Sequence, residues 1–118
     1  MADEDLVKAL LGLDKLEKIV MEYFFKNVSV GEVIALIELK DELRRRQRSG
    51  ELTIAAGSDE EAAIERELRK AIANLMRLGL LEYRLGSYNL SQSLREYVKR
   101  KLGKLEPGTS KDLMKLLS

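Results

Sequence analysis

The chain of 118 residues contains no cysteine and no histidine. Without cysteine it can form no disulfide, and it offers no thiolate nucleophile and no cysteine-ligated zinc site. Without histidine it lacks the commonest general base and the commonest zinc ligand. Catalysis would depend on carboxylates, lysine, tyrosine or serine, and we find no glycine-rich phosphate loop or nucleophile motif that would organise them. We therefore expect a protein that is not an enzyme and that holds no metal or other cofactor.

Long hydrophobic runs are also missing. No apolar stretch approaches the roughly 18–20 residues that a membrane-spanning helix needs. The first residues, Met1 to Asp5, are acidic, whereas the start of a secretory signal is basic. With 45% hydrophobic and 35% charged residues, the composition is typical of one globular domain. We expect a cytoplasmic protein with no membrane partner and no small-molecule substrate.

Amide side chains are scarce, with three asparagines and two glutamines against 21 lysines and arginines. This composition resembles that of heat-adapted proteins. The net charge of +1 hides an uneven distribution: residues 1–65 carry nine basic and fifteen acidic side chains, and residues 66–118 carry twelve basic and five acidic ones. A polyanionic partner would therefore meet the second half of the chain.

Hydrophobic spacing predicts a helix over residues 13–26, after a short amphipathic lead-in over residues 1–12. One side of this helix carries the expected core positions, which are Leu13, Leu16, Ile19, Val20, Tyr23 and Phe24. Met21 and Phe25, four residues apart, form a second apolar strip on the opposite side. An exposed aromatic strip is unfavourable for a monomer, so we expect a cover from the terminal segments or from another subunit.

A second helix is predicted over residues 30–48, opened by a capping box at Ser29 and Glu32. It carries two apolar stripes. The first stripe consists of Val30, Val33, Ile34 and Ile37, and the second consists of Leu36, Leu39 and Leu43. A helix with two apolar stripes packs on two sides. The second stripe is therefore either a subunit seam or the contact for a terminal helix of the same chain.

Helix-start and hairpin signals in the rest of the chain predict a third helix over residues 59–78, a β-hairpin over residues 80–91 and another helix that ends near residue 102. Gly79 lies where a glycine commonly ends a helix, and Gly86 lies in the hairpin turn. We therefore expect a lead-in over residues 1–12, a domain over residues 13–103 and a short C-terminal helix within residues 104–118.

The predicted order of helix, helix, helix, hairpin and helix resembles a winged helix-turn-helix of an archaeal or thermophile-like kind. The resemblance is most specific over residues 72–91, from Ile72-Ala73-Asn74-Leu75 through Gly86 to Tyr88-Asn89-Leu90-Ser91. It implies a mainly α fold with a small β-hairpin, here with an extended second helix and additional terminal helices. Winged helices of this kind usually bind duplex DNA as homodimers, with the third helix in the major groove and the hairpin, or wing, on the flanking backbone.

The basic residues of the second half fit this resemblance. If Leu68, Ile72, Leu75 and Leu78 face the core, then Arg66, Lys70 and Arg77 point away from it, with Arg69 alongside. The predicted DNA contacts, made by helix 59–78, the wing 80–91 and the following helix, are Arg66, Arg69, Lys70, Asn74, Arg77, Arg84, Arg95, Lys99 and Arg100. We thus expect a non-catalytic DNA-binding protein, such as a small transcriptional regulator or a chromatin- or replication-associated factor.

The alternative is a protein–protein adaptor, an accessory subunit of a replication or transcription assembly. The acidic first half, the long second helix and the surplus apolar strips favour it. The predicted partner or dimer contacts are Met21, Phe25, Leu36, Leu39, Leu43, Leu113 and Leu117. Lys18-x-x-Met21-x-x-Phe24-Phe25 also loosely resembles a sliding-clamp-binding peptide, although it lacks the glutamine of such peptides.

Overall fold

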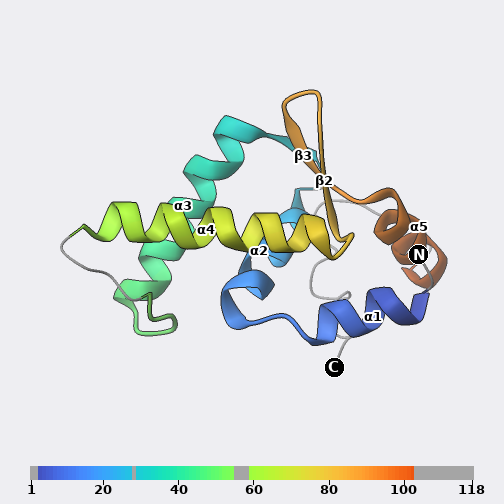
Figure 1. Ribbon diagram of the computed structural model, residues 1–118, viewed down its shortest axis with the longest axis horizontal. Helices are drawn as coiled ribbons and strands as arrows, with labels where there is room; N and C mark the ends of the chain where they lie inside the picture. The colour runs from blue at the N-terminus through green and yellow to red at the C-terminus, as the bar shows by residue number, and fades with distance from the viewer. Residues whose placement is uncertain (1–2, 28, 55–58, 103–118) are drawn as a thin grey trace.

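A computed structural model of the chain describes residues 3–27, 29–54 and 59–102 (Figure 1). Its elements in order are α1 (Asp3–Leu11), α2 (Lys15–Lys26), β1 (Ser29–Gly31), α3 (Glu32–Arg48), α4 (Glu60–Arg77), β2 (Leu81–Arg84), β3 (Ser87–Leu90) and α5 (Gln92–Leu102). The mainly helical fold with a small β-hairpin is confirmed. The predicted short C-terminal helix lies outside the described residues.

The hairpin belongs to a three-stranded antiparallel sheet with the order β1-β3-β2. Tyr88 on the central strand pairs with Val30 on one side and with Tyr83 on the other. The predicted capping box at Ser29 and Glu32 is wrong, because Ser29 pairs with Asn89 in the sheet and α3 begins at Glu32 without a side-chain cap. A pairing between distant segments has replaced the local hydrogen bonds that the sequence favours.

Aspartates fix the starts of two helices. Asp14 accepts a hydrogen bond from the Glu17 amide at 2.8 Å, and the Glu17 side chain accepts one from the Asp14 amide at 3.0 Å, which completes a capping box at the start of α2. Asp59 accepts a hydrogen bond from the Ala62 amide at 3.2 Å at the start of α4. These caps agree with the predicted starts of both helices to within two residues.

Helix α4 organises the core. It packs against α2, α3 and β2, and in Figure 1 it runs along the long axis of the molecule with α3 crossing it. Its buried face consists of Ala63, Ile64, Leu68, Ala71, Ile72 and Leu75. Its opposite face, which carries Arg66 and Lys70, remains in solvent. The sequence-based assignment of the two faces of this helix is confirmed.

Both apolar strips of α2 are buried within the chain. Met21 and Phe25 are as inaccessible as Val20 and Phe24 on the other strip. The reason is that α2 has α3, α4 and β3 as neighbours, so its own chain covers it on several sides. These neighbours lie in the middle of the chain, so the cover differs from the two expected from the sequence, which were the terminal segments and another subunit. Burial of Met21, Phe24 and Phe25 also removes the resemblance to an accessible clamp-binding peptide.

Helix α3 buries one of its two stripes and exposes most of the other. Leu36, Leu39 and Leu43, expected from the sequence to form either a subunit seam or the contact for a terminal helix, lie in the core of this chain. Within α3 the leucine stripe extends from Leu36 to Leu43, whereas the competing stripe ends at Ile37 and is followed on that side by Asp41 and Arg48. The longer stripe buries more apolar surface, which explains why it faces α4.

Candidate interaction surfaces

The first candidate surface is an apolar strip at the start of α3. Val33, Ile34 and Ile37 have exposed fractions of 70%, 58% and 59%, and we call these three residues the α3 apolar strip. They occupy about 100° of the helix circumference, opposite Leu39 in the core. Single exposed aliphatic residues are ordinary, but three on one face form a contiguous patch of the kind that marks interaction sites.

The hairpin tip lies beside this strip. The Glu32 amide, at the start of α3, donates a 2.9 Å hydrogen bond to the Gly86 carbonyl, and the Tyr83 hydroxyl donates one of 2.7 Å to Glu32 Oε2. Because its hydroxyl is bound to a carboxylate, the pKa of Tyr83 is raised. The tip residue Leu85 has an exposed fraction of 98%. In Figure 1 the tip and the first turn of α3 lie at the same edge of the molecule.

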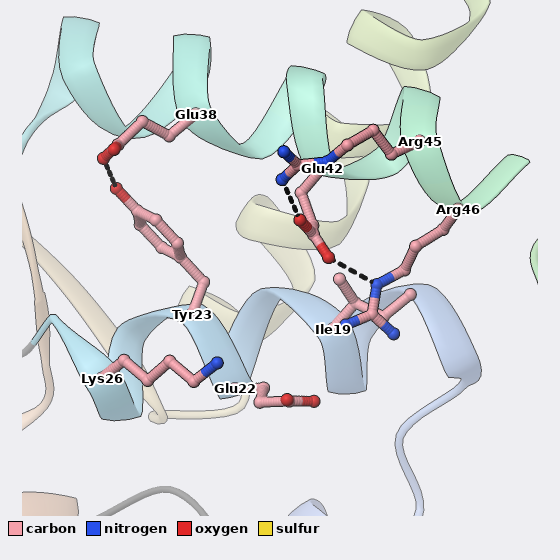
Figure 2. Close-up of a pocket in the computed structure, with 8 residues that line it drawn as sticks. All are labelled: Ile19, Glu22, Tyr23, Lys26, Glu38, Glu42, Arg45 and Arg46. Carbon is pink, nitrogen blue, oxygen red and sulfur yellow. Dashed lines mark hydrogen bonds and ion pairs between the residues drawn. The ribbon is translucent and has the colours of Figure 1, made fainter. Parts of the chain in front are cut away.

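A polar pocket between α2 and α3 borders the strip on its other side (Figure 2). The Tyr23 hydroxyl donates a 2.5 Å hydrogen bond to Glu38 Oε1, and burial together with this bond raises the pKa of Tyr23. Arg46 Nε donates a 2.8 Å hydrogen bond to Glu42 Oε1, while Arg45 binds the other carboxylate oxygen. Glu38 is one helical turn from Ile34 in the strip. The bond between Tyr23 and Glu38 therefore joins α2 to α3, whereas the bonds of Glu42 with Arg45 and Arg46 lie within α3.

The remaining side chains around this pocket are Ile19, Glu22 and Lys26. They supply mixed charges and one aliphatic surface, with no arrangement of an activated nucleophile and its base. Across the described ranges of the chain, no cluster of acidic residues is suited to hold a metal ion. The pocket is best explained by one hydrogen bond between α2 and α3 and by ion pairs within α3 that line it.

Glu42 makes the ion pairs within α3 sensitive to acid. The hydrogen bond from Arg46, opposed by burial and reinforced by Arg45, holds the pKa of the Glu42 carboxyl below its ordinary value of 4.5. The stabilising contribution is therefore present above pH 4.5 and is lost as the pH falls through the lower pKa of the folded state. We expect Glu42→Gln to lower the free energy of unfolding by about 0.5–1 kcal/mol at pH 7, and by less at pH 3.

Chemical denaturation of wild type and Glu42→Gln across pH 3–7 measures this difference. Glu22→Gln is the matched control, because Glu22 lines the same pocket and interacts with Arg46 by Coulomb attraction rather than by a hydrogen bond. Parallel pH profiles for wild type and Glu42→Gln would contradict the assignment.

The basic face of α4, which we define as Arg66, Arg69, Lys70 and Arg77, is interleaved with carboxylates. Glu67 Oε1 lies 3.7 Å from both Arg66 Nε and Lys70 Nζ, and Glu65 Oε1 lies 3.4 Å from Arg69 Nη2. The side chains of Arg66, Arg69 and Lys70 are nevertheless more than half exposed. Exposed ion pairs of this kind are weak. The face therefore presents mixed charge, with its cations still accessible.

Asn74 and Arg77 are engaged with neighbours. Arg77 donates to Asn74 Oδ1 at 2.6 and 3.1 Å, and Asn74 Nδ2 donates to Glu17 Oε2 at 2.5 Å. Asn74 thus connects α4 to α2. An amide held in this way has to give up its present partner before it can contact a base edge.

Of the predicted DNA contacts on the hairpin and α5, Arg95 and Arg100 are engaged with neighbouring groups. Arg95 Nη2 lies 3.0 Å from Glu82 Oε1 and joins α5 to the hairpin. Arg100 Nε donates to the Glu96 carbonyl at 3.3 Å. Arg84 and Lys99 are exposed, and in the part of the chain that the structure describes neither forms an ion pair.

The residues proposed from the sequence as partner contacts lie elsewhere. Met21, Phe25, Leu36, Leu39 and Leu43 are all in the core. Leu113 and Leu117 lie outside the described residues. The accessible apolar residues of α3 are instead those of the α3 apolar strip, which belong to the first of the two stripes predicted from the sequence. The signal that distinguishes the two stripes is length, since only the leucine stripe continues into the second half of α3.

No helix within the described ranges is long and apolar enough to cross a membrane. A family model described as PolB1 Binding Protein 2 matches residues 14–96. The match begins at the cap of α2 and ends within α5, so it includes the α3 apolar strip, the pocket and the hairpin. No curated protein and no solved structure matches the chain.

Proposed function

This chain belongs to the PolB1 Binding Protein 2 family, and from that premise we propose that it is a non-catalytic accessory protein that binds the PolB1 polymerase. The α3 apolar strip is the contact surface. The observation that carries this assignment is the exposure of Val33, Ile34 and Ile37 on the face of α3 opposite the core. Large aliphatic side chains in solvent cost the isolated chain free energy, which a partner recovers by covering them.

Size-exclusion chromatography with light scattering tests this proposal directly. The chain, purified PolB1 and their mixture are run at one protein concentration. We expect the mixture to yield a complex containing both proteins, and the chain alone to elute as a monomer. Failure of the two proteins to associate would reject the proposal. A dimer of the chain that does not join PolB1 would instead identify a second copy as the partner for the strip.

Duplex DNA is the second candidate partner, and we propose it on a separate observation. Arg84 and Lys99 are exposed without an ion pair among the described residues, and the basic face of α4 retains accessible cations in weak pairs. The element order resembles that of a winged helix, in which the third helix and the wing meet DNA. Such binding would depend mainly on phosphate contacts and would fall steeply with salt.

Fluorescence anisotropy with a random-sequence duplex separates the two candidates. Wild type is compared at low and physiological salt with Arg66→Glu/Lys70→Glu/Arg77→Glu, and with the control Lys8→Glu/Lys15→Glu/Lys18→Glu, which makes the same charge change on α1 and α2. DNA binding predicts that only the first variant loses affinity. Absence of binding at low salt would reject the DNA candidate, because the electrostatic attraction is strongest there.

A further inference from the structure

The hairpin tip has an unusual composition for its conformation. Leu85 and Gly86 have φ angles of 51° and 78°, and two central residues with positive φ are characteristic of the type I′ hairpin turn. Asparagine, aspartate or glycine is favoured at the first of these positions, because other L-residues bring Cβ too close to the following carbonyl oxygen. Leu85 is the one non-glycine residue with a positive φ in the described part of the chain.

Packing within the chain does not offset this conformational cost. The Leu85 side chain is 98% exposed, more than any other large hydrophobic side chain in the described ranges. It therefore combines an unfavourable backbone conformation with complete exposure of an apolar group. Neither property benefits the isolated chain, whereas a protruding aliphatic side chain on a short rigid turn is well suited to fill a pocket.

The position of the tip identifies which partner it meets. The hydrogen bond from the Glu32 amide to the Gly86 carbonyl places the tip next to the first turn of α3, so Leu85 extends the α3 apolar strip. Arg84 belongs to the other face of the hairpin, because side chains alternate along a strand and Tyr83 is the one bound to Glu32. A partner that covers the strip therefore also reaches Leu85.

The charges around this surface indicate the chemistry of that partner. Glu32 and Glu38 border the strip, and each accepts a hydrogen bond from a tyrosine hydroxyl. Among the described residues, neither forms an ion pair with a lysine or arginine. Lys40 and Arg44, further along the same side of α3, are paired with Glu65 and Glu61. The carboxylates of Glu32 and Glu38 therefore give the border its unpaired charge, which complements an apolar segment flanked by basic side chains.

We propose that Leu85 is an anchor that enters an apolar pocket on PolB1, beside an aliphatic segment that covers the α3 apolar strip and carries lysine or arginine toward Glu32 and Glu38. This inference rests on the proposed function and adds the second contact point and the chemistry of the partner surface. Leu85 fixes one end of the interface, and Glu32 and Glu38 orient the partner segment that lies along α3.

Leu85→Asn tests the anchor, because it is expected to raise the stability of the isolated chain and to lower its affinity for PolB1. Asparagine before glycine is the favoured pair in this turn, so the melting temperature of the isolated chain is expected to rise. Affinity for purified PolB1, measured by isothermal titration calorimetry, is expected to fall by about tenfold or more, as for removal of an interface anchor. A residue with only a structural role would change both quantities in the same direction.

The controls distinguish the possible failures. Leu11→Asn, at an exposed leucine at the end of α1, is expected to leave affinity unchanged. Glu32→Gln/Glu38→Gln is expected to weaken binding at low salt and to reduce its salt dependence. If wild type does not bind PolB1, the proposed function fails. If wild type binds and Leu85→Asn binds equally well, the anchor is wrong while the proposed function stands. If Leu85→Asn weakens binding to duplex DNA and leaves PolB1 binding unchanged, the tip serves DNA, and the assignment to PolB1 is overturned.

Discussion

Replacement of Ile34 and Ile37 together by glutamate is expected to lower the affinity for PolB1 by about 100-fold or more, equivalent to about 2.8 kcal/mol. The two isoleucines supply most of the accessible aliphatic surface of the α3 apolar strip. The variant removes that surface and places two carboxylates where the complex excludes water, and a charge buried without a partner is strongly unfavourable. Repulsion from Glu38, one turn after Ile34, adds to the effect.

Calorimetric titration against purified PolB1 measures this change. Leu11→Glu is the matched control, because it introduces the same charge at a similarly exposed aliphatic residue on α1, outside the region that the family model matches. Circular dichroism should show that both variants keep the wild-type helical content, since all three positions are in solvent. Wild-type affinity for Ile34→Glu/Ile37→Glu would require the polymerase to bind another face of the chain.

Truncation of Leu39 to alanine is expected to lower the free energy of unfolding by about 2–5 kcal/mol. Its side chain is fully buried on the leucine stripe of α3, and the contact between α3 and α4 leaves little room for the chain to collapse around a cavity. The domain is small, so a change of this size removes a large part of its total stability.

Chemical denaturation compares Leu39→Ala with Ile37→Ala, two residues away on the exposed face. The control is expected to change stability by no more than about 0.5 kcal/mol, because the Ile37 side chain makes few contacts in the folded chain. The pair therefore tests the orientation of α3. Equal effects at the two positions, or a larger effect at Ile37, would mean that the helix is rotated so that the isoleucine stripe faces the core.

The elements that the sequence predicted correctly are those whose signals are local. Local patterns placed the starts of α2 and α4 to within two residues, although the aspartates that cap them, Asp14 and Asp59, were not identified. Gly86 marks a hairpin turn through its backbone conformation. The period of the apolar residues assigns the inward face of α4, because that helix has one strong apolar stripe. Each of these inferences requires only residues that are neighbours in sequence.

The features that the sequence did not predict depend on contacts between distant segments. Strand β1 exists because β3 provides a partner for Ser29, and no local pattern distinguishes this segment from the start of a helix. The two stripes of α3 are both apolar and both periodic, so the sequence alone does not indicate which one faces the core. Packing against α4 decides this. The leucine stripe, expected to be a subunit seam or the contact for a terminal helix, became part of the core, and Ile34 was left accessible.

The candidate site was predicted only in part. The outward basic residues of α4 were identified by periodicity, but the pairing of Arg69 with Glu65 and of Lys70 with Glu67, which the local spacings of four and three residues favour, was not predicted. The bond between Asn74 and Glu17 joins residues 57 positions apart and has no counterpart in the local sequence. Leu85 was assigned to the turn without an account of its conformation.

The bond between Tyr83 and Glu32 joins residues 51 positions apart, and it links the strip and the hairpin tip into the one discontinuous surface that we propose as the epitope for PolB1. The α3 apolar strip and the hairpin tip are fixed relative to each other before a partner binds, so little conformational entropy is lost on binding. A peptide copied from the 17 residues of α3 would lack the tip and would be marginally helical in water. Such a peptide would be a poor competitor for the polymerase, and recognition would be lost over the same temperature interval in which the chain unfolds.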